Sequence, residues 1–284
     1  MIKAAGVMGF PISHSLSPRL HGYWIKKYNL NATYVAWEVP PERLAARLKS
    51  LPDTLADQGE VFRGTNLTIP LKEKALDIVD IIEEDARAIG AINTVVVEGD
   101  GLLVGRNTDG IGFTDSLAEK VNVADFNGKT ALVLGAGGAA KAIVFALNKM
   151  GFAKILITNR TRARAEELVD HLSEGAEVLD WDARETCLSD VSLVVNTTSL
   201  GMKGQPELQM SLHGLASGAV VTDIVYTPLK TNLLLEAEKN GFVAVDGLGM
   251  LLHQAKAGFE AWFGVTPEVD EDLREFVLQG LAGK

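Results

Sequence analysis

The sequence contains very little cysteine: Cys187 is the one cysteine among 284 residues, so the chain can form no internal disulfide. Such sparing use of cysteine is typical of a reducing compartment, and we expect a cytoplasmic protein. Long apolar runs are also missing, since none reaches the roughly 18 residues that a membrane span requires. The N-terminal residues lack the apolar core of a secretory leader, so we expect no signal peptide and no contact with a membrane.

Positive charge is scarce as well. The chain has 27 Lys and Arg residues against 37 Asp and Glu residues, which gives a net charge of −10. An acidic chain of this kind is a poor candidate for binding nucleic acid or an anionic membrane. With 47% hydrophobic residues, the chain can build one large or two ordinary domains. Any basic cluster in it therefore indicates a local binding site, and we assign no metal ligands.

A glycine-rich turn lies between a predicted strand, Ala131–Leu134, and a predicted helix, Ala140–Met150. It matches the G-x-G-x-x-G/A fingerprint of dinucleotide sites, with Ala140 in the third place. Gly135 allows the tight turn, and Gly137 allows the backbone to approach a pyrophosphate at the helix N-terminus. The flanking strand and helix favour a dinucleotide site over an unrelated glycine turn. The cofactor loop that we predict consists of Gly135, Ala136, Gly137, Gly138 and Ala139.

The residues after the next predicted strand, Lys154–Thr158, indicate which dinucleotide binds. An NAD site usually places Asp or Glu here, whereas an Arg suits the 2′-phosphate of NADP. This sequence has Asn159 and Arg160, followed by Thr161 as a helix cap and Arg164 in the first helical turn. A solvated basic helix start is the alternative, but cations are unfavourable at a helix N-terminus. We therefore expect NADP(H) as the cofactor.

Apolar periodicity predicts alternating strands and helices in the first part of the chain. The predicted strands are Ile2–Val7, Thr33–Val39, Val61–Leu67, Ala91–Val97 and Leu102–Gly105. The predicted helices are Leu16–Tyr28, Pro41–Leu51, Leu71–Ala88 and Asp109–Val123. In the third of these, apolar residues recur at helical spacing at Leu71, Ala75, Ile78, Val79 and Ile82. The alternation predicts a mostly parallel sheet.

The second part has the pattern of a Rossmann-type domain. After the two strands above, further strands are predicted at Glu177–Trp181, Leu193–Asn196, Ala219–Val225 and Phe242–Val245. Helices fit between most of the six, and helices at Gly249–Trp262 and 268–281 follow. We predict a two-domain α/β fold: an open, mostly parallel substrate domain of residues 1–110 and an NADP-binding Rossmann-type domain of residues 111–245. The helices of residues 246–284 follow the second domain and have the option of packing back on the first.

Polar residues gather in four loops that follow predicted strands of the first domain. Because ligands bind at the carboxyl ends of strands in open α/β sheets, these loops are candidates for a substrate site. Their candidate residues are Ser15, Ser17, Thr68, Lys72, Asn93, Thr108 and Asp109. Ser17 before Pro18 can instead be a helix cap, and so can Asp109. Together the loops offer hydroxyls, amides, one ammonium and one carboxylate, a mixture that suits a small hydroxylated acid.

Several longer motifs occur in one order along nearly the whole chain. They are Pro-Ile-x-His-Ser-x-Ser-Pro (11–18), Asn-x-Thr-x-Pro-x-Lys (66–72), Gly-Ala-x-Asn-Thr (90–94), Asn-Thr-Asp-Gly (107–110), Gly-Ala-Gly-Gly-Ala (135–139), Asn-Arg-Thr-x-x-Arg (159–164), Asn-x-Thr-Ser-x-Gly-Met (196–202), Asp-x-x-Tyr-x-Pro (223–228) and Gly-Leu-Gly-Met-Leu-x-x-Gln-Ala (247–255). In this respect the sequence resembles the shikimate dehydrogenase family. Gly22 is a small departure from the family pattern, because the family usually has Asn directly after the histidine that corresponds to His21.

The resemblance implies NADPH-dependent, reversible reduction of 3-dehydroshikimate to shikimate, a step toward chorismate and the aromatic amino acids. By similarity, the substrate ligands are Ser15, Ser17, Thr68, Asn93, Asp109, Tyr226 and Gln254. Lys72 and Asp109 resemble the family's catalytic pair, and Ile224 and Gly247 correspond to positions on the nicotinamide side. Family members are commonly monomers or dimers, so we expect a monomer or a homodimer.

Two other functions stay open. A quinate/shikimate dehydrogenase of the same family would use NAD, which the cluster of Arg160 and Arg164 disfavours. A non-catalytic protein that senses NADP(H) would need no acid–base pair, so Lys72 and Asp109 disfavour it.

Overall fold

The computed structural model describes residues 1–172 and 175–282, and the chain divides into two compact units. The first unit comprises Met1–Thr108 and Gln254–Lys284, and the second comprises Asp109–His253. Helix α8 (Gly247–Phe263) begins in the second unit and ends in the first, so the division runs through it. The sequence-based boundary at residue 246 lies just before this helix.

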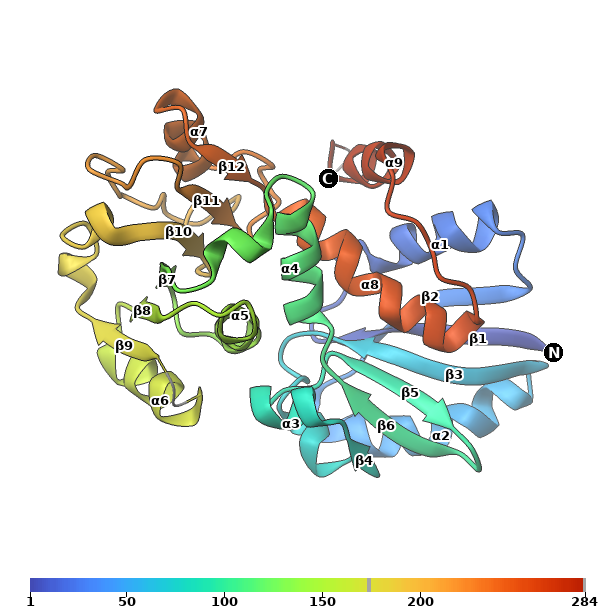
Figure 1. Ribbon diagram of the computed structural model, residues 1–284. Coiled ribbons are helices and arrows are strands. Elements are labelled where there is room, and N and C mark those ends of the chain that lie inside the picture. Colours follow the sequence, from blue (N-terminus) through green and yellow to red (C-terminus); the bar gives the residue numbers. More distant parts are fainter. Residues whose placement is uncertain (173–174, 283–284) are drawn as a thin grey trace. The chain divides into compact units, whose positions relative to one another are not determined.

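The first unit contains a six-stranded sheet (Figure 1). Its strands are β1 (Ile2–Gly9), β2 (Ala32–Glu38), β3 (Glu60–Leu67), β4 (Ile81–Ile82), β5 (Thr94–Glu98) and β6 (Leu102–Arg106). They lie in the order β2-β1-β3-β5-β6-β4. β1 is parallel to β2 and β3, and β4 is parallel to β6, whereas β5 is antiparallel to both of its neighbours. The beginning of β5 therefore lies at the same edge as the ends of β3 and β6.

The helices of the first unit include the C-terminal one, as the sequence predicted. They are α1 (Ser17–Lys27), α2 (Leu44–Ala56), α3 (Glu84–Ile89) and α9 (Glu271–Ala282), with 3₁₀ turns η1 (Pro41–Arg43) and η2 (Lys74–Asp77). α9 packs on α1, where the Arg19 Nε donates a hydrogen bond to the Phe276 carbonyl at 2.6 Å. The Tyr23 and Phe276 rings also meet there, with centroids 5.1 Å apart. The last helix thus returns to the N-terminal unit.

The prediction of a single helix over Leu71–Ala88 is wrong. The structure replaces it with η2, the short strand β4 and α3. The Asp80 N–H donates to the Leu103 carbonyl at 2.9 Å, and the Glu83 N–H donates to the Gly105 carbonyl at 3.0 Å. These bonds join the segment to β6, so strand pairing decides its conformation. The apolar residues that suggested a helix still pack on the core of this unit, but from an irregular chain.

The second unit contains a parallel sheet of Rossmann type. Its strands are β7 (Thr130–Leu134), β8 (Lys154–Thr158), β9 (Ala176–Leu179), β10 (Val191–Asn196), β11 (Val220–Asp223) and β12 (Val243–Val245). Their order is β12-β11-β10-β7-β8-β9, and every adjacent pair is parallel. This is the doubly wound order, which reverses direction between β7 and β10. A ligand crevice is expected at that point.

Helices connect some of these strands but not all. The helices are α4 (Asp109–Ala118), α5 (Gly138–Lys149), α6 (Arg162–Leu172) and α7 (Asn232–Lys239), with 3₁₀ turns η3 (Val123–Phe126), η4 (Trp181–Ala183) and η5 (Leu188–Asp190). β9 leads to β10 through 3₁₀ turns, and the fully described residues 197–219 between β10 and β11 contain no helix. Over the described part of the chain, no helix combines the length and apolar character needed to cross a membrane.

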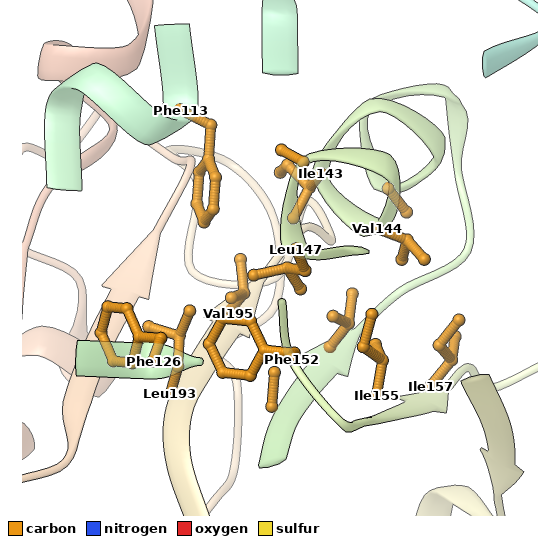
Figure 2. Close-up of a cluster of buried hydrophobic side chains, with 14 of the residues drawn as sticks. Phe113, Phe126, Ile143, Val144, Leu147, Phe152, Ile155, Ile157, Leu193 and Val195 are labelled. Atoms are coloured by element: carbon orange, nitrogen blue, oxygen red, sulfur yellow. The ribbon is translucent and has the colours of Figure 1, made fainter. Parts of the chain in front are cut away.

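Both faces of the second sheet are buried, which explains its continuous apolar runs. In β7, Ala131 and Val133 belong to the hydrophobic cluster beneath α5, whereas Leu132 and Leu134 belong to the cluster on the opposite face. Figure 2 shows the first cluster, in which Ile143, Val144 and Leu147 of α5 lie beside side chains of β8 and β10. Each buried aliphatic side chain contributes about 1.5–3 kcal/mol. This packing holds the glycine turn between β7 and α5 on a rigid base.

A buried histidine lies in the aromatic core of the first unit. His21 of α1 is 0% exposed, and its ring stacks on Tyr34 with centroids 4.0 Å apart. Phe259 and Trp262 of α8 flank it at 5.8 and 5.6 Å. Neither ring nitrogen has a hydrogen-bond partner among the described residues. Burial lowers the pKa of His21 to about 3, which the nearby Asn66 side chain only partly opposes.

This histidine makes stability depend on pH. Below pH 6.5 the unfolded chain takes up a proton at His21, whereas the folded chain does not until about pH 3. The free energy of unfolding therefore falls as pH drops through this window, by up to about 1.4 kcal/mol per unit. In urea unfolding, we expect wild type to lose about 2 kcal/mol more than H21L between pH 7 and pH 5. Parallel losses in the two proteins would contradict this assignment.

Candidate functional site

The glycine turn of the second unit has the geometry of a phosphate site. Gly135 has a φ of +111°, and a Cβ there would lie 2.6 Å from Thr197 Oγ1, so only glycine fits. Gly137 precedes α5 in an extended conformation, with φ −95° and ψ −173°. A Cβ on Gly137 or Gly138 would meet nothing within 4 Å, so a ligand can approach the backbone. The first N–H groups of a helix lack intrahelical partners and bind phosphate well.

A pocket of about 640 Å³ opens beside this turn. Six of the predicted cofactor residues line it: Gly135, Ala136, Gly137, Asn159, Arg160 and Arg164. The other predicted cofactor residues are not part of its wall. Gly138 and Ala139 form the first turn of α5, and Thr161 immediately precedes α6. The structure thus brings the glycine turn and the residues after β8 to one cavity.

The arginines beside this pocket differ in their ion pairs. Arg162 donates to Glu166 at 2.8 Å and also pairs with Asp180. Arg160 and Arg164 are exposed, and neither has a carboxylate partner among the described residues. The Asn159 side chain donates to the Thr161 carbonyl at 2.8 Å and brings no negative charge. Two unneutralised guanidinium groups at a cavity wall fit a phosphate.

Other residues of this wall escaped the sequence analysis. They are Trp181, Arg184, Thr197, Thr198, Ser199, Leu200, Gln205, Pro206, Glu207 and Gln209. Arg184 donates to the carbonyls of Trp181 and Gln209, each at 2.6 Å, and so joins two segments of the wall. Its guanidinium also lies 4.7 Å from the centre of the Trp181 ring. Thr198 and Ser199 belong to the motif at 196–202, which gave them no binding role, whereas no sequence pattern indicated Trp181 or Arg184.

Two further predicted residues lie at the carboxyl ends of β11 and β12. Ile224 follows β11, and Gly247 begins α8 shortly after β12. A Cβ on Gly247 would lie 2.2 Å from the Ile224 carbonyl oxygen, so the two backbones touch. Tyr226 follows in the same turn, and burial raises the pKa of its hydroxyl.

In the first unit, a buried polar network surrounds Asn93. Its Oδ1 accepts from the Thr108 N–H at 2.9 Å, and its Nδ2 donates to Thr108 Oγ1 at 3.0 Å. The Thr94 hydroxyl also donates to Oδ1, at 3.0 Å. Asn66 Nδ2 donates to Thr94 Oγ1 at 3.1 Å, and Asn66 Oδ1 accepts from the Tyr34 hydroxyl at 2.6 Å. Asn93 and Thr108 are therefore held rigidly at one edge of the sheet.

The remaining polar candidates of this unit lie in loops at the same edge. The Thr68 N–H donates to the Met8 carbonyl at 2.9 Å, next to the end of β1. The backbone carbonyl of the half-buried Lys72 accepts a hydrogen bond from the Ile92 N–H at 2.8 Å. This bond ties the loop of Lys72 to the segment before β5. Ser17 is buried, and its N–H donates to Ser15 Oγ at 3.3 Å. These loops lie where the sequence analysis expected a substrate.

Asp109 and Gln254 stand at the two places where the chain passes between units. Asp109 is buried and begins α4, directly after Thr108. Gln254 lies half-buried within α8. The pairing of Lys72 with Asp109 stays a prediction. Among residues 1–172 and 175–282, no group of three or more His, Cys, Asp or Glu side chains could hold a metal ion.

Family models match most of the chain. The shikimate dehydrogenase substrate-binding domain matches residues 7–95, the shikimate/quinate 5-dehydrogenase model matches 116–203, and the shikimate 5′-dehydrogenase C-terminal domain matches 247–274. The chain belongs to the shikimate dehydrogenase family. This result confirms the resemblance that the ordered motifs indicated.

Individual relatives agree with the family models. A protein of Cereibacter sphaeroides named shikimate dehydrogenase (NADP(+)) is 48% identical over 277 residues, which cover 98% of this chain and 97% of that one. The shikimate dehydrogenase structure from Aquifex aeolicus has a TM-score of 0.85 at 36% identity, covering 98% of each chain. The Thermus thermophilus enzyme in complex with NADP(H) and shikimate has a TM-score of 0.84 at 35% identity, covering 98% of this chain and 99% of that one.

The different surroundings of the arginines predict a selective effect on phosphate binding. We expect Arg160→Ala and Arg164→Ala each to weaken binding of adenosine 2′,5′-bisphosphate about tenfold or more, because a charged hydrogen bond contributes about 1.5–3 kcal/mol. Arg162→Ala is the matched control, since Glu166 and Asp180 already engage that side chain. Isothermal titration calorimetry measures all three. Equal losses in the three variants would show that the effect is general electrostatics.

Proposed function

We propose that this protein catalyses the NADPH-dependent, reversible reduction of 3-dehydroshikimate to shikimate. The observation that carries the proposal is the pocket in which the glycine turn meets Arg160 and Arg164, two cations without carboxylate partners in the described chain. The family of the chain supports the choice of substrate, since the Thermus thermophilus relative binds NADP(H) and shikimate. NAD specificity is disfavoured because no carboxylate follows β8 to hold a ribose 2′-hydroxyl.

The residues that hold NADP(H) in this proposal come from three places in the second unit. The N–H groups of residues 135–139 bind the pyrophosphate, and Asn159, Arg160, Thr161 and Arg164 surround the 2′-phosphate. The nicotinamide end of the cofactor lies against the turn that contains Ile224 and against Gly247, which touches that turn. When bound, NADPH supplies the hydride for the carbonyl carbon of the substrate. The domain roles follow: residues 111–245 bind the cofactor, and residues 1–110 with 246–284 bind the substrate.

The substrate is held by neutral polar groups and one cation in this proposal. Hydroxyls of Ser15 and Ser17 bind its carboxylate, while the amides of Asn93 and Gln254 bind its ring hydroxyls. Further contacts come from Thr68, Thr108 and Tyr226. The buried network around Asn93 supports this arrangement, because it fixes the side chain before any ligand arrives and so lowers the entropic cost of binding.

Lys72 is the general acid of the proposed reaction. Negative charge develops on the carbonyl oxygen at C3 of the substrate as that carbon is reduced. The Lys72 ammonium stabilises this charge and gives the oxygen a proton, and the Asp109 carboxylate fixes the position of the ammonium. In the reverse direction, Lys72 takes the proton back. We also propose a cytoplasmic location, which the single cysteine supports, and a monomeric or homodimeric state.

An absorbance assay of the reduced nicotinamide tests the reaction directly. Wild-type protein should oxidise shikimate with NADP⁺, and kcat/KM should be at least about tenfold higher with NADP⁺ than with NAD⁺, because only the former engages the guanidinium groups. Quinate in place of shikimate measures substrate strictness. Faster turnover with NAD⁺ and quinate would identify the rival dehydrogenase, and binding of NADPH without turnover would identify a sensor.

Removing the proposed acid should separate binding from chemistry. We expect Lys72→Ala to lower kcat by about 10²–10⁴-fold, the usual contribution of a positioned general acid, with little change in NADPH affinity. Lys74→Ala removes an exposed ammonium two residues further on and should keep the wild-type rate. Steady-state kinetics and NADPH titration measure both. A near-normal rate in Lys72→Ala would refute the catalytic role.

A further inference from the structure

A buried carboxylate of the second unit has no role in the function proposed above. Asp223 ends β11 and is 0% exposed. Its Oδ1 accepts from Asn196 Nδ2 at 3.0 Å and from the Val225 N–H at 2.9 Å, and its Oδ2 accepts from the Thr231 hydroxyl at 2.7 Å. Burial raises the pKa of Asp223, although each of these three hydrogen bonds acts to lower it. One side chain thus joins three separate segments of the chain.

The first segment leads into the wall of the cofactor pocket. Asn196 ends β10, and its Oδ1 accepts from the N–H of Thr198 at 3.0 Å and from its hydroxyl at 2.7 Å. Its Nδ2 donates to the Leu200 carbonyl at 3.2 Å as well as to Asp223. Residues 197–200 line the pocket beside the glycine turn. The conformation of this loop therefore depends on Asn196, and Asn196 is oriented by Asp223.

The second segment is the turn of Ile224, Val225 and Tyr226. Asp223 binds the Val225 N–H, and the Ile224 N–H donates to the Asn196 carbonyl at 3.1 Å. On the other side, Gly247 lies against the Ile224 carbonyl. The turn is thus held by hydrogen bonds to β10 and by backbone contact with the start of α8.

All partners of Asp223 in the described chain are neutral. A buried carboxylate without a cation beside it costs free energy, so its presence here indicates that the surrounding donors need its particular acceptors. One oxygen must accept two N–H groups while the other accepts a hydroxyl. An asparagine could meet the same demand, because the Thr231 hydroxyl can turn and accept instead of donating. An aliphatic side chain of similar size could not.

We propose that Asp223 is a positioning residue that locks the 224–226 turn to the 197–200 loop and thereby orients the nicotinamide half of bound NADP(H). The inference rests on the proposed function, because that function assigns the turn to the nicotinamide side. The adenosine half binds in the pocket at the glycine turn, Arg160 and Arg164, whose wall does not include the 224–226 turn. Loss of Asp223 should therefore affect the two halves of the cofactor differently.

Three variants and three measurements test this role. Asp223→Leu removes every acceptor. Asp223→Asn keeps the oxygen that accepts from Asn196 and Val225 and replaces Oδ2 with an NH₂ group that donates to a reversed Thr231 hydroxyl. Thr231→Val removes only the partner of Oδ2. The measurements are the affinity for adenosine 2′,5′-bisphosphate, the fluorescence change of NADPH on binding, and kcat for shikimate. If Asp223→Leu does not fold, Asp223→Ala takes its place, since its smaller side chain admits water to the orphaned donors.

We expect Asp223→Leu to lower kcat at least tenfold and to reduce the NADPH fluorescence change, with a several-fold smaller loss of bisphosphate affinity than of kcat. Asp223→Asn should stay within threefold of wild type in all three measurements. Thr231→Val should keep the fluorescence change and kcat near wild type, because the contacts to Asn196 and Val225 remain.

Other outcomes overturn the inference. If Asp223→Leu weakens bisphosphate binding as much as it lowers kcat, the role is general stability. If Asp223→Asn fails as badly as Asp223→Leu, the negative charge matters and not the geometry of the acceptors. Unchanged NADPH fluorescence and kcat in Asp223→Leu also overturn it. Should wild type bind NADPH but not oxidise shikimate, the proposed function fails, while the two binding measurements still decide the positioning role.

Discussion

The close contact between the Gly135 turn and Thr197 is the constraint on which the candidate cofactor site depends. β7 and β10 are adjacent parallel strands, so the loops that follow them leave the sheet at one edge. A Cβ on Gly135 would lie 2.6 Å from Thr197 Oγ1, which leaves no room for any other residue. The Thr197 hydroxyl in turn donates to the Leu134 carbonyl at 2.8 Å. The pocket exists because these two backbones can approach so closely.

Each unit supports its candidate residues with a buried polar network of neutral donors. Asn93, Thr94 and Thr108 form one at an edge of the first sheet, and Asn196, Asp223 and Thr231 form the other at the ends of β10 and β11. Buried polar groups are costly when unsatisfied, so such a network tolerates few arrangements. Both networks therefore restrict loops that would otherwise sample many conformations.

Local patterns predicted the second unit better than the first. The strand and helix around the glycine turn were predictable because both faces of β7 are buried and α5 presents one apolar stripe to it. The Leu71–Ala88 segment has the same helical periodicity, yet it pairs with β6 at Asp80 and Glu83. Periodicity reports which residues are buried, and a short strand with flanking turns can bury the same residues as a helix.

The family, the α/β class and the chemical types at the site could all be predicted from the sequence, because local motifs and apolar spacing carry each of them. The folded chain was needed to show which arginines lack carboxylate partners among the described residues, that Trp181 and Arg184 belong to the pocket wall, and that Asp223 joins three segments. These facts depend on contacts between residues distant along the chain. Strand order and side-chain packing set such contacts, and no local pattern encodes them.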